Sequence, residues 1–228
     1  MSIGMIILAA GIGERMGKPL PKQYALLGGK PIIMHTLEKA EKLDEVDAVV
    51  ITCPPGYLDE TQGLLANHLL HKEFVCIEGG ETRQSSVLEG LRALSDHDTV
   101  IIHEAVRPFV TLEEFEALIA SEYANAIYGA PIPFTVLEGH DHVEGLLARQ
   151  DLVNVQLPQK FDRERLLEAH EQAEAEGREY TEDASLLFAH ADERIAILPG
   201  SELNIKITHP ADMIVGEAIY EQYVLGKG

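Results

Sequence analysis

The sequence predicts an α/β protein in which a mainly parallel sheet carries helices on both faces. Short apolar runs typical of buried strands alternate with helical patterns along most of the 228 residues. Turns that contain Arg or Lys, two of them rich in glycine, follow several of these runs. Since parallel sheets carry their sites beyond the carboxyl ends of the strands, we expect loops 9–22, 78–86 and 103–108 to meet on one rim.

The first strand, loop and helix carry the most informative local pattern. An apolar run at residues 5–8 precedes glycines 11, 13 and 17, and a helical pattern follows at residues 31–42. Glycine lets backbone N–H groups face outward, and a row of such donors binds phosphate oxygens. Positive charge at this turn comes from Arg15, Lys18 and Lys22. An unoccupied βα turn is the alternative, but it has no need of these cations.

The later elements continue the alternation. The further predicted strands are 48–52, 74–77, 99–103, 128–136 and 195–198. The further predicted helices are 58–70, one that presents residues 87, 88, 91 and 94 on one face, 163–176, 184–187 and 210–223. Residues 181–183 stand immediately before the predicted helix at 184, and we interpret them as its N-terminal cap and first acidic residues and not as functional residues. Lys206 alternates with Ile205 and Ile207 in a predicted strand, so it points either to solvent or to the shared rim.

The middle of the chain lacks helical periodicity. Residues 138–155 contain short apolar runs and turn residues, which we interpret as a β-arm within one domain that covers residues 1–228. His140 and His142 flank Asp141 on a polar turn, but no third ligand follows at a metal-binding spacing. We therefore expect a solvated surface there and no metal site formed by side chains.

Composition excludes several classes of protein. The chain has 18 Lys and Arg against 38 Asp and Glu, a formal charge of −20, which argues against a nucleic-acid or anionic-membrane surface. Cys53 and Cys76 lie in strand-like runs and resemble core residues of a protein in a reducing compartment. No 18-residue apolar segment and no secretory pattern is present, so we expect a soluble cytoplasmic protein.

Six segments together resemble the 2-C-methyl-D-erythritol 4-phosphate cytidylyltransferases and the related ribitol-5-phosphate cytidylyltransferases. In family order they are L-A-A-G-x-G-x-R-M-G with P-K-Q (8–23), G-G-E-T-R-Q-S-S-V (79–87), H-E-A-V-R-P (103–108), P-Q-K-F (158–161), T-E-D-A-S (181–185) and N-I-K-I-T (204–208). The resemblance implies a Rossmann-like nucleotidyltransferase fold with a mixed, mostly parallel seven-stranded sheet. It also implies a homodimer in which each β-arm reaches the site of the partner.

The reaction that the resemblance implies joins CTP to a phosphorylated polyol and releases pyrophosphate, with Mg²⁺ carried by the CTP phosphates. By position, the nucleotide would be held by Ala9, Ala10, Gly11, Gly13, Gly80, Glu81, Ser86 and Ala105. The reacting phosphates would be flanked by Arg15, Lys22 and Lys206. The acceptor would be bound by Glu104, Arg107, Thr135 and Arg149, the last from the partner's arm. Because a phosphate monoester is mostly dianionic at neutral pH, cations that position and neutralise charge suffice without a general base.

Three departures from the family pattern lie on the acceptor side. Phe134 stands where the family usually has Asp, Leu157 where it has Thr, and Glu104 where it has Asp. The acceptor therefore stays open between methylerythritol phosphate in a remodelled pocket and another polyol or sugar phosphate. A CTP-binding paralogue without turnover is one alternative. A dinucleotide-dependent oxidoreductase fits less well, because the loop reads Gly-x-Gly-x-x-x-Gly and no acidic residue ends the second strand.

Overall fold

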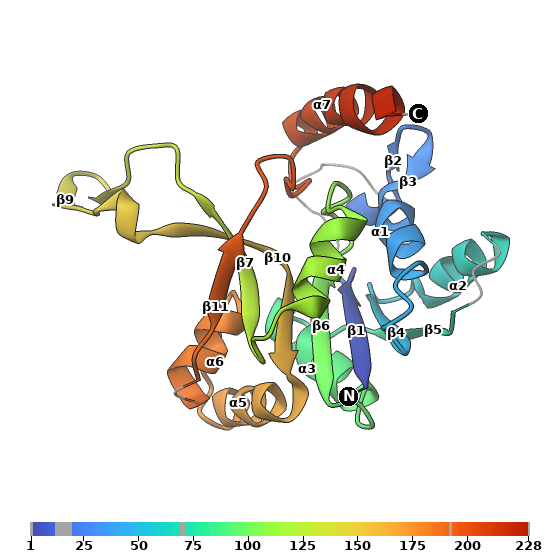
Figure 1. The fold of residues 1–228 in the computed structure, drawn as a ribbon, viewed down its shortest axis with the longest axis horizontal. Coiled ribbons are helices and arrows are strands. Elements are labelled where there is room, and N and C mark those ends of the chain that lie inside the picture. Colours follow the sequence, from blue (N-terminus) through green and yellow to red (C-terminus); the bar gives the residue numbers. More distant parts are fainter. Residues whose placement is uncertain (1, 12–19, 69–71, 192, 228) are drawn as a thin grey trace.

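The computed structural model describes residues 2–11, 20–68, 72–191 and 193–227 (Figure 1). Within these residues the central element is a seven-stranded sheet in the order β11-β7-β10-β6-β1-β4-β5. Its strands are β1 (Ile3–Leu8), β4 (Ala48–Cys53), β5 (Phe74–Glu78), β6 (Thr99–Glu104), β7 (Ala126–Pro131), β10 (Val153–Asp162) and β11 (Ala196–Pro199). The pairs β1–β4, β1–β6, β4–β5 and β7–β11 are parallel, which confirms the predicted mixed, mostly parallel sheet.

Strand β10 provides the antiparallel part of this sheet, because it pairs antiparallel with both β6 and β7. The sequence pattern does not predict this strand, because residues 153–155 fall within the expected arm and no strand is expected at residues 158–161. The predicted strand at 128–136 was also displaced, since β7 ends at Pro131. Buried and exposed residues do not alternate along the inner half of β10, because residues 156–161 are buried on both faces of the sheet.

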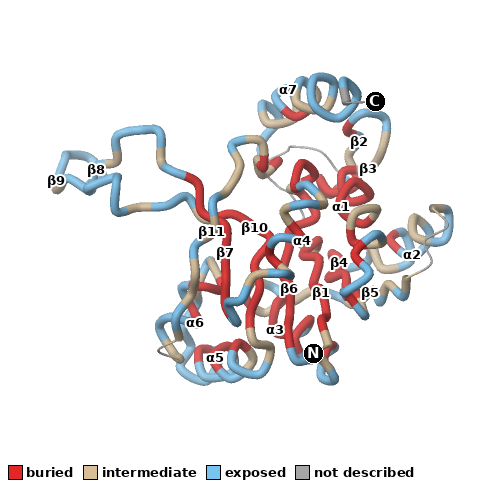
Figure 2. The backbone as a smooth tube through the Cα atoms, in the orientation of Figure 1, coloured by how far each residue is buried: buried red, intermediate tan, exposed pale blue. Residues whose placement is uncertain are grey.

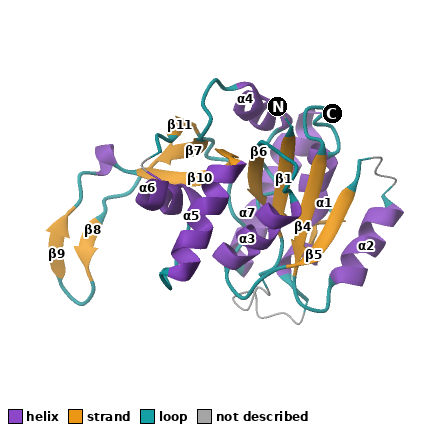
Figure 3. Cartoon of the chain, turned by 90° about the horizontal axis from the view of Figure 1, so that it is seen from below, coloured by secondary structure: helices purple, strands orange, loops and turns teal. Residues whose placement is uncertain are grey.

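Helices cover both faces of the sheet, as predicted (Figure 3). They are α1 (Ile32–Ala40), α2 (Leu58–Asn67), α3 (Arg83–Ala93), α4 (Leu112–Ala120), α5 (Arg163–Ala175), α6 (Asp183–Ala191) and α7 (Pro210–Ile219). The alternation of β1 divides the core: Met5 and Ile7 face the cluster that contains α1 and α4, whereas Ile6 and Leu8 face α3, α5 and α6. Helix α4 was not predicted, although Thr111 and Glu114 form a capping box at its start.

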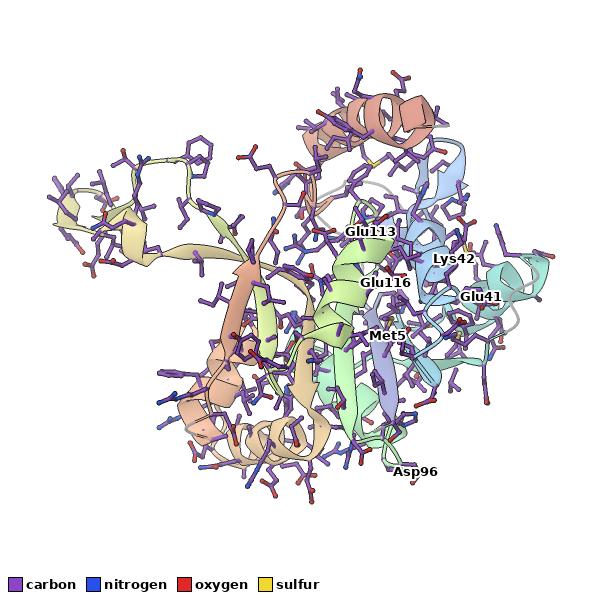
Figure 4. All side chains as sticks on the ribbon, in the orientation of Figure 1. Met5, Glu41, Lys42, Asp96, Glu113 and Glu116 are labelled. Carbon is purple, nitrogen blue, oxygen red and sulfur yellow. The ribbon has the colours of Figure 1, made fainter. Side chains whose placement is uncertain are left out.

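Apolar side chains lie between the layers and charged ones on the outside (Figure 4). Met5 of β1 is fully buried between the sheet and the helices, whereas Glu113 and Glu116 lie on the exposed side of α4. Among the described residues, no helix is long and apolar enough to cross a membrane.

Two small hairpins complete the described chain. β8 (Leu137–Gly139) pairs with β9 (Val143–Leu146), and this exposed hairpin extends away from the sheet (Figure 2). His140 and His142 lie exposed in its turn. The other hairpin, β2 (Leu26–Leu27) with β3 (Lys30–Pro31), packs under α7 through a cluster that includes Leu27 and Ile207. α7 thus fixes the segment that precedes it, which carries Lys206.

Candidate active site

A cavity of about 250 Å³ lies at the carboxyl ends of β1, β5 and β6. It brings together the three predicted loops and the segment before α7. Its described lining consists of Leu8, Ala9, Ala10, Gly11, Lys22, Gln23, Gly80, Glu81, Thr82, Arg83, Ser86, Glu104, Val106 and Lys206. Segments that are distant in sequence meet here because parallel strands end at the same edge of a sheet.

The first glycine-rich turn is held by a side chain from its far end. Gln23 donates from Nε2 to the carbonyl oxygens of Ala9 and Gly11, the latter at 3.2 Å. Lys22 precedes it in the 3₁₀ turn Lys22–Tyr24 and is only 8% exposed. The Pro-Lys-Gln segment therefore closes the described start of the turn and directs a nearly buried cation to the cavity.

The second glycine-rich loop packs directly against the first. The N–H of Gly79 donates to Cys53 O at 2.9 Å, and a Cβ at residue 79 would overlap with the Cβ of Ala10. Thr82 and Ser85 form a capping box, so α3 begins immediately after this loop. Ser86 donates from its hydroxyl to Thr82 O at 2.9 Å. Glycine at position 79 is thus required for the close approach of the two loops.

Glu104 lies at the centre of the charged part of the cavity. Among the described residues, its carboxylate contacts Lys206 Nζ at 2.7 Å, Arg107 Nε at 3.0 Å and Arg83 Nε at 3.7 Å. Burial by itself would raise the pKa of Glu104, but the charges of Lys206, Arg107 and Arg83 outweigh it and lower the pKa to about 2. Glu104 is therefore ionised at neutral pH and orients the cations around it.

A second buried carboxylate holds Arg83 from the opposite side. Asp183 Oδ2 lies 2.6 Å from Arg83 Nη2, and Asp183 Oδ1 lies 3.1 Å from His170 Nε2. Burial would raise the pKa of Asp183, but the charge of Arg83 and the contacts with His170 lower it to about 2. The sequence pattern predicts a helix N-cap at residues 181–183. The structure corrects this for Asp183, because Glu182 caps the helix by accepting from Ala184 N at 2.8 Å.

The predicted site residues divide into three groups. Ala9, Ala10, Gly11, Lys22, Gly80, Glu81, Ser86, Glu104 and Lys206 line the cavity. Gly13 and Arg15 lie outside the described residues. Ala105, Arg107, Thr135 and Arg149 are described but do not line the cavity of this chain.

The residues of the third group have other surroundings. Ala105 is fully buried and its N–H donates to Leu8 O at 3.0 Å, so it supports the cavity from behind. Arg107 donates hydrogen bonds from Nε to Glu104 Oε2 at 3.0 Å and from Nη1 to Asn204 O at 3.0 Å. Thr135 is exposed on the way to the arm. Arg149 lines a separate hollow of about 450 Å³ and donates from Nη1 to Pro133 O at 3.1 Å.

Lys206 points to the rim, which is one of its two expected orientations, but it does not lie in a strand. Residues 204–208 form no strand in the structure. The N–H of Ile207 donates to Val106 O at 2.9 Å, and Ile207 is fully buried while Lys206 points to Glu104. The sequence assigns no role in the site to Gln23 or Asp183, and Arg83 is expected only as one of its cations, although all three lie in the quoted motifs.

The described donor groups of the cavity form no metal site of their own. Among the described residues, no three His, Cys, Asp or Glu side chains group in a way that could hold a metal ion. Two described carboxylates line the cavity: Glu104, which three cations surround, and the exposed Glu81. Mg²⁺ prefers oxygen ligands and retains waters, so these residues fit an ion held mainly by nucleotide phosphates.

The fold and the cation-lined cavity at its strand ends define the protein as an α/β nucleotidyltransferase. Comparison with protein families specifies the class further. The model of the 2-C-methyl-D-erythritol 4-phosphate cytidylyltransferase (IspD) family matches residues 3–222, and the chain belongs to this family.

Individual relatives cover nearly the full chain. A 2-C-methyl-D-erythritol 4-phosphate cytidylyltransferase of Halalkalibacterium halodurans is 38% identical over 223 residues, 96% of this chain and 97% of the relative. A ribitol-5-phosphate cytidylyltransferase of Lactiplantibacillus plantarum is 30% identical over 226 residues, 95% of this chain and 97% of the relative. The crystal structure of 4-diphosphocytidyl-2C-methyl-D-erythritol synthase from Anaerococcus prevotii matches with a TM-score of 0.85 at 28% identity and covers 96% of each chain.

Proposed function

We propose that this enzyme transfers CMP from CTP to a phosphorylated polyol of the methylerythritol 4-phosphate or ribitol 5-phosphate type. The observation that carries the proposal is the placement of Lys22 and Lys206, from opposite ends of the chain, in one cavity with both glycine-rich loops. Relatives named for both acceptors support the same reaction class.

The chemistry requires positioning and charge neutralisation. An oxygen of the acceptor's phosphate attacks the α-phosphorus of CTP, the bond from the α-phosphorus to the bridging oxygen of the β-phosphate breaks, and pyrophosphate leaves with the electron pair. The glycine-rich loops hold the nucleotide, while Lys22 and Lys206, with Arg15 from the undescribed turn, neutralise charge that develops on the phosphates. Mg²⁺, when bound to the triphosphate, screens the charge of the leaving group.

We further propose that the active form is a homodimer in which Arg149 reaches the acceptor phosphate in the partner's site. The β8–β9 hairpin and its approach expose large apolar side chains, including Phe134 at 75%, Val143 and Leu146. Exposed apolar side chains do not stabilise a hairpin that is surrounded by water, which favours a protein surface as their cover.

Free Cys53 and Cys76 fit a reducing compartment, and we place the reaction in the cytoplasm.

The acceptor pocket is proposed to differ from the usual family pocket. Among the described residues, neither Phe134 nor Leu157 lines the cavity of its own chain: Phe134 lies exposed near the arm and Leu157 is buried in the core. A polar acceptor group that loses its usual partner costs on the order of 1 to 3 kcal/mol when buried. We therefore expect as acceptor either methylerythritol phosphate in a remodelled pocket or another polyol or sugar phosphate.

The test is an assay of pyrophosphate release. The protein is incubated with Mg²⁺, CTP and, in turn, methylerythritol 4-phosphate, ribitol 5-phosphate and a panel of small polyol phosphates, with ATP, GTP and UTP as nucleotide controls. We expect release that depends on CTP and on one acceptor. Efficient turnover of methylerythritol 4-phosphate would contradict the altered acceptor. CTP binding without turnover of any acceptor would favour the silent paralogue, and NADH binding would favour an oxidoreductase.

A further inference from the structure

A chain of polar and charged side chains connects the cavity to helices α5 and α6. It runs from His170 on α5 through Asp183 on α6 to Arg83 at the start of α3, and from there to Glu104 at the end of β6. Asp183 is 1% exposed and His170 is fully buried. Lys206 lies at the end of this chain, 2.7 Å from Glu104.

We propose that Asp183 is a positioning residue that fixes Arg83 and, through Arg83, the Glu104–Lys206 pair at the reacting phosphates. This inference rests on the proposed function. Asp183 itself does not line the cavity, whereas Arg83, Glu104 and Lys206 all do. Its effect on the reaction must therefore pass through Arg83.

A capping role does not explain Asp183. An acidic residue at the first position of a helix commonly serves its N-terminus. Here Glu182 performs that task, since its Oε2 accepts from Ala184 N at 2.8 Å and from Ser185 N at 3.3 Å. The carboxylate of Asp183 points instead to Arg83 and His170. Because an ionised carboxylate can only accept, His170 must donate its Nε2 proton to Asp183, which fixes the orientation of both side chains.

The local backbone is arranged to keep α6 close to Arg83. Gln84, the residue after Arg83, donates from Nε2 to Arg178 O at 3.2 Å and accepts from Tyr180 N at 2.7 Å. These bonds attach the segment before α6 to the start of α3. Two neighbouring residues of α3 thus hold the start of α6 and the segment before it: Arg83 by an ion pair with Asp183, and Gln84 by hydrogen bonds from its side chain to backbone atoms.

Arg83 has capacity left for a ligand. Both of its Nη atoms are buried and find no partner of hydrogen-bond geometry among the described residues, although Nη2 lies 2.6 Å from Asp183 Oδ2 and Nε lies 3.7 Å from Glu104 Oε1. A buried guanidinium N–H without a partner is costly, and a nucleotide phosphate would supply one. The ion pair with Asp183 holds the guanidinium beside Glu104.

The experiment compares kinetics with stability in Asp183→Asn, Arg83→Gln and the double variant. Each single variant leaves one buried charge without its partner, whereas the double variant removes both and should be at least as stable as either single. We expect kcat to fall about tenfold to a hundredfold in all three variants, because the side chains that contact the reacting phosphates would be displaced. If Asp183 acts through Arg83, adding Asp183→Asn to Arg83→Gln changes kcat by no more than about twofold.

Asp162→Ala is the matched control. Asp162 caps α5 by accepting from Arg165 N at 2.9 Å and does not line the cavity, so its loss should lower the thermal midpoint and leave kcat unchanged. Recovery of kcat in the double variant along with its stability would overturn the inference, because it would make Asp183 merely structural. Multiplicative effects of the two substitutions would overturn it as well. An inactive wild type would overturn the proposed function and this inference together, whereas unaffected variants of an active wild type overturn the inference alone.

Discussion

Lys206 Nζ lies 2.7 Å from Glu104 Oε1, although 102 residues separate the two side chains. The same carboxylate contacts Arg107 through its other oxygen at 3.0 Å. Glu104 therefore holds the ammonium group of Lys206 at the cavity through an ion pair. A nucleotide phosphate must compete with this contact, or share Lys206 with it.

Replacing Glu104 by Gln tests this relationship. The variant keeps the size of the side chain but removes the charge that three cations surround, so we expect kcat/KM to fall at least about tenfold and the free energy of unfolding to fall by about 2 kcal/mol. Steady-state kinetics and urea unfolding measure both. Glu104→Asp is the matched control, because it keeps the charge and installs the residue that is usual in the family. Equal losses in the two variants would contradict an electrostatic role.

Acid should destabilise the protein through the two buried carboxylates of the site. The pKa values of Glu104 and Asp183 are lowered to about 2 in the folded protein, from ordinary values of 4.5 and 3.8. Burial opposes both shifts, and the neighbouring cations outweigh it. Their stabilisation is thus fully present above about pH 4.5 and is lost as the pH falls toward 2, on the order of 2 kcal/mol for each group.

Urea unfolding at intervals from pH 6 to pH 2.5 measures this acid limb. The slope of unfolding free energy against pH should be smaller in Asp183→Asn than in the wild type, because one of the two titrating groups is gone. An unchanged slope would show that other carboxylates cause the acid transition.

Lys22→Ala should separate catalysis from nucleotide binding. Lys22 is almost buried in the cavity, and we expect its charge to act mainly in the transition state, so kcat should fall by about two orders of magnitude or more while the Kd for CTP changes comparatively little. Calorimetry and pyrophosphate release provide the two values. Lys42→Ala, at an exposed lysine just beyond α1, is the control and should match the wild type (Figure 4). Parallel losses in kcat and CTP affinity would mean that Lys22 binds only the ground state.

Gly79→Ala should weaken CTP binding. The added methyl group would overlap with Ala10 Cβ, so one of the two glycine-rich loops must move. We expect at least about a tenfold increase in the Kd for CTP, since a shift of about 1 Å misplaces a ligand group. Gly63→Ala is the control: no described atom lies within 4 Å of its added Cβ, and alanine stabilises the interior of a helix by about 0.5 to 1 kcal/mol. Unchanged CTP affinity in Gly79→Ala would show that the loops need not touch.

Local patterns predicted most of the sheet and both helical layers. β1, β4 and β6 are mostly apolar runs with almost every residue buried, because helices cover both faces of a parallel sheet. β10 could not be predicted in this way. Its outer part is exposed on the way to the arm and its inner part contains polar side chains, such as Gln156 and Lys160, that are buried by pairing with distant carbonyl groups.

The sequence alone predicted that two glycine-rich turns and several cations meet at one rim of the sheet, because the strand ends of a parallel sheet share an edge. Only the tertiary structure decided how these cations are held. Glu104 joins Lys206, Arg107 and Arg83, and Asp183 holds Arg83 from a helix about a hundred residues later. Ion pairs of this kind depend on distances between elements that approach only when the core is packed. The sequence pattern therefore predicts which cations lie at the site, whereas the packing of the helices and strands determines which carboxylates pair with them.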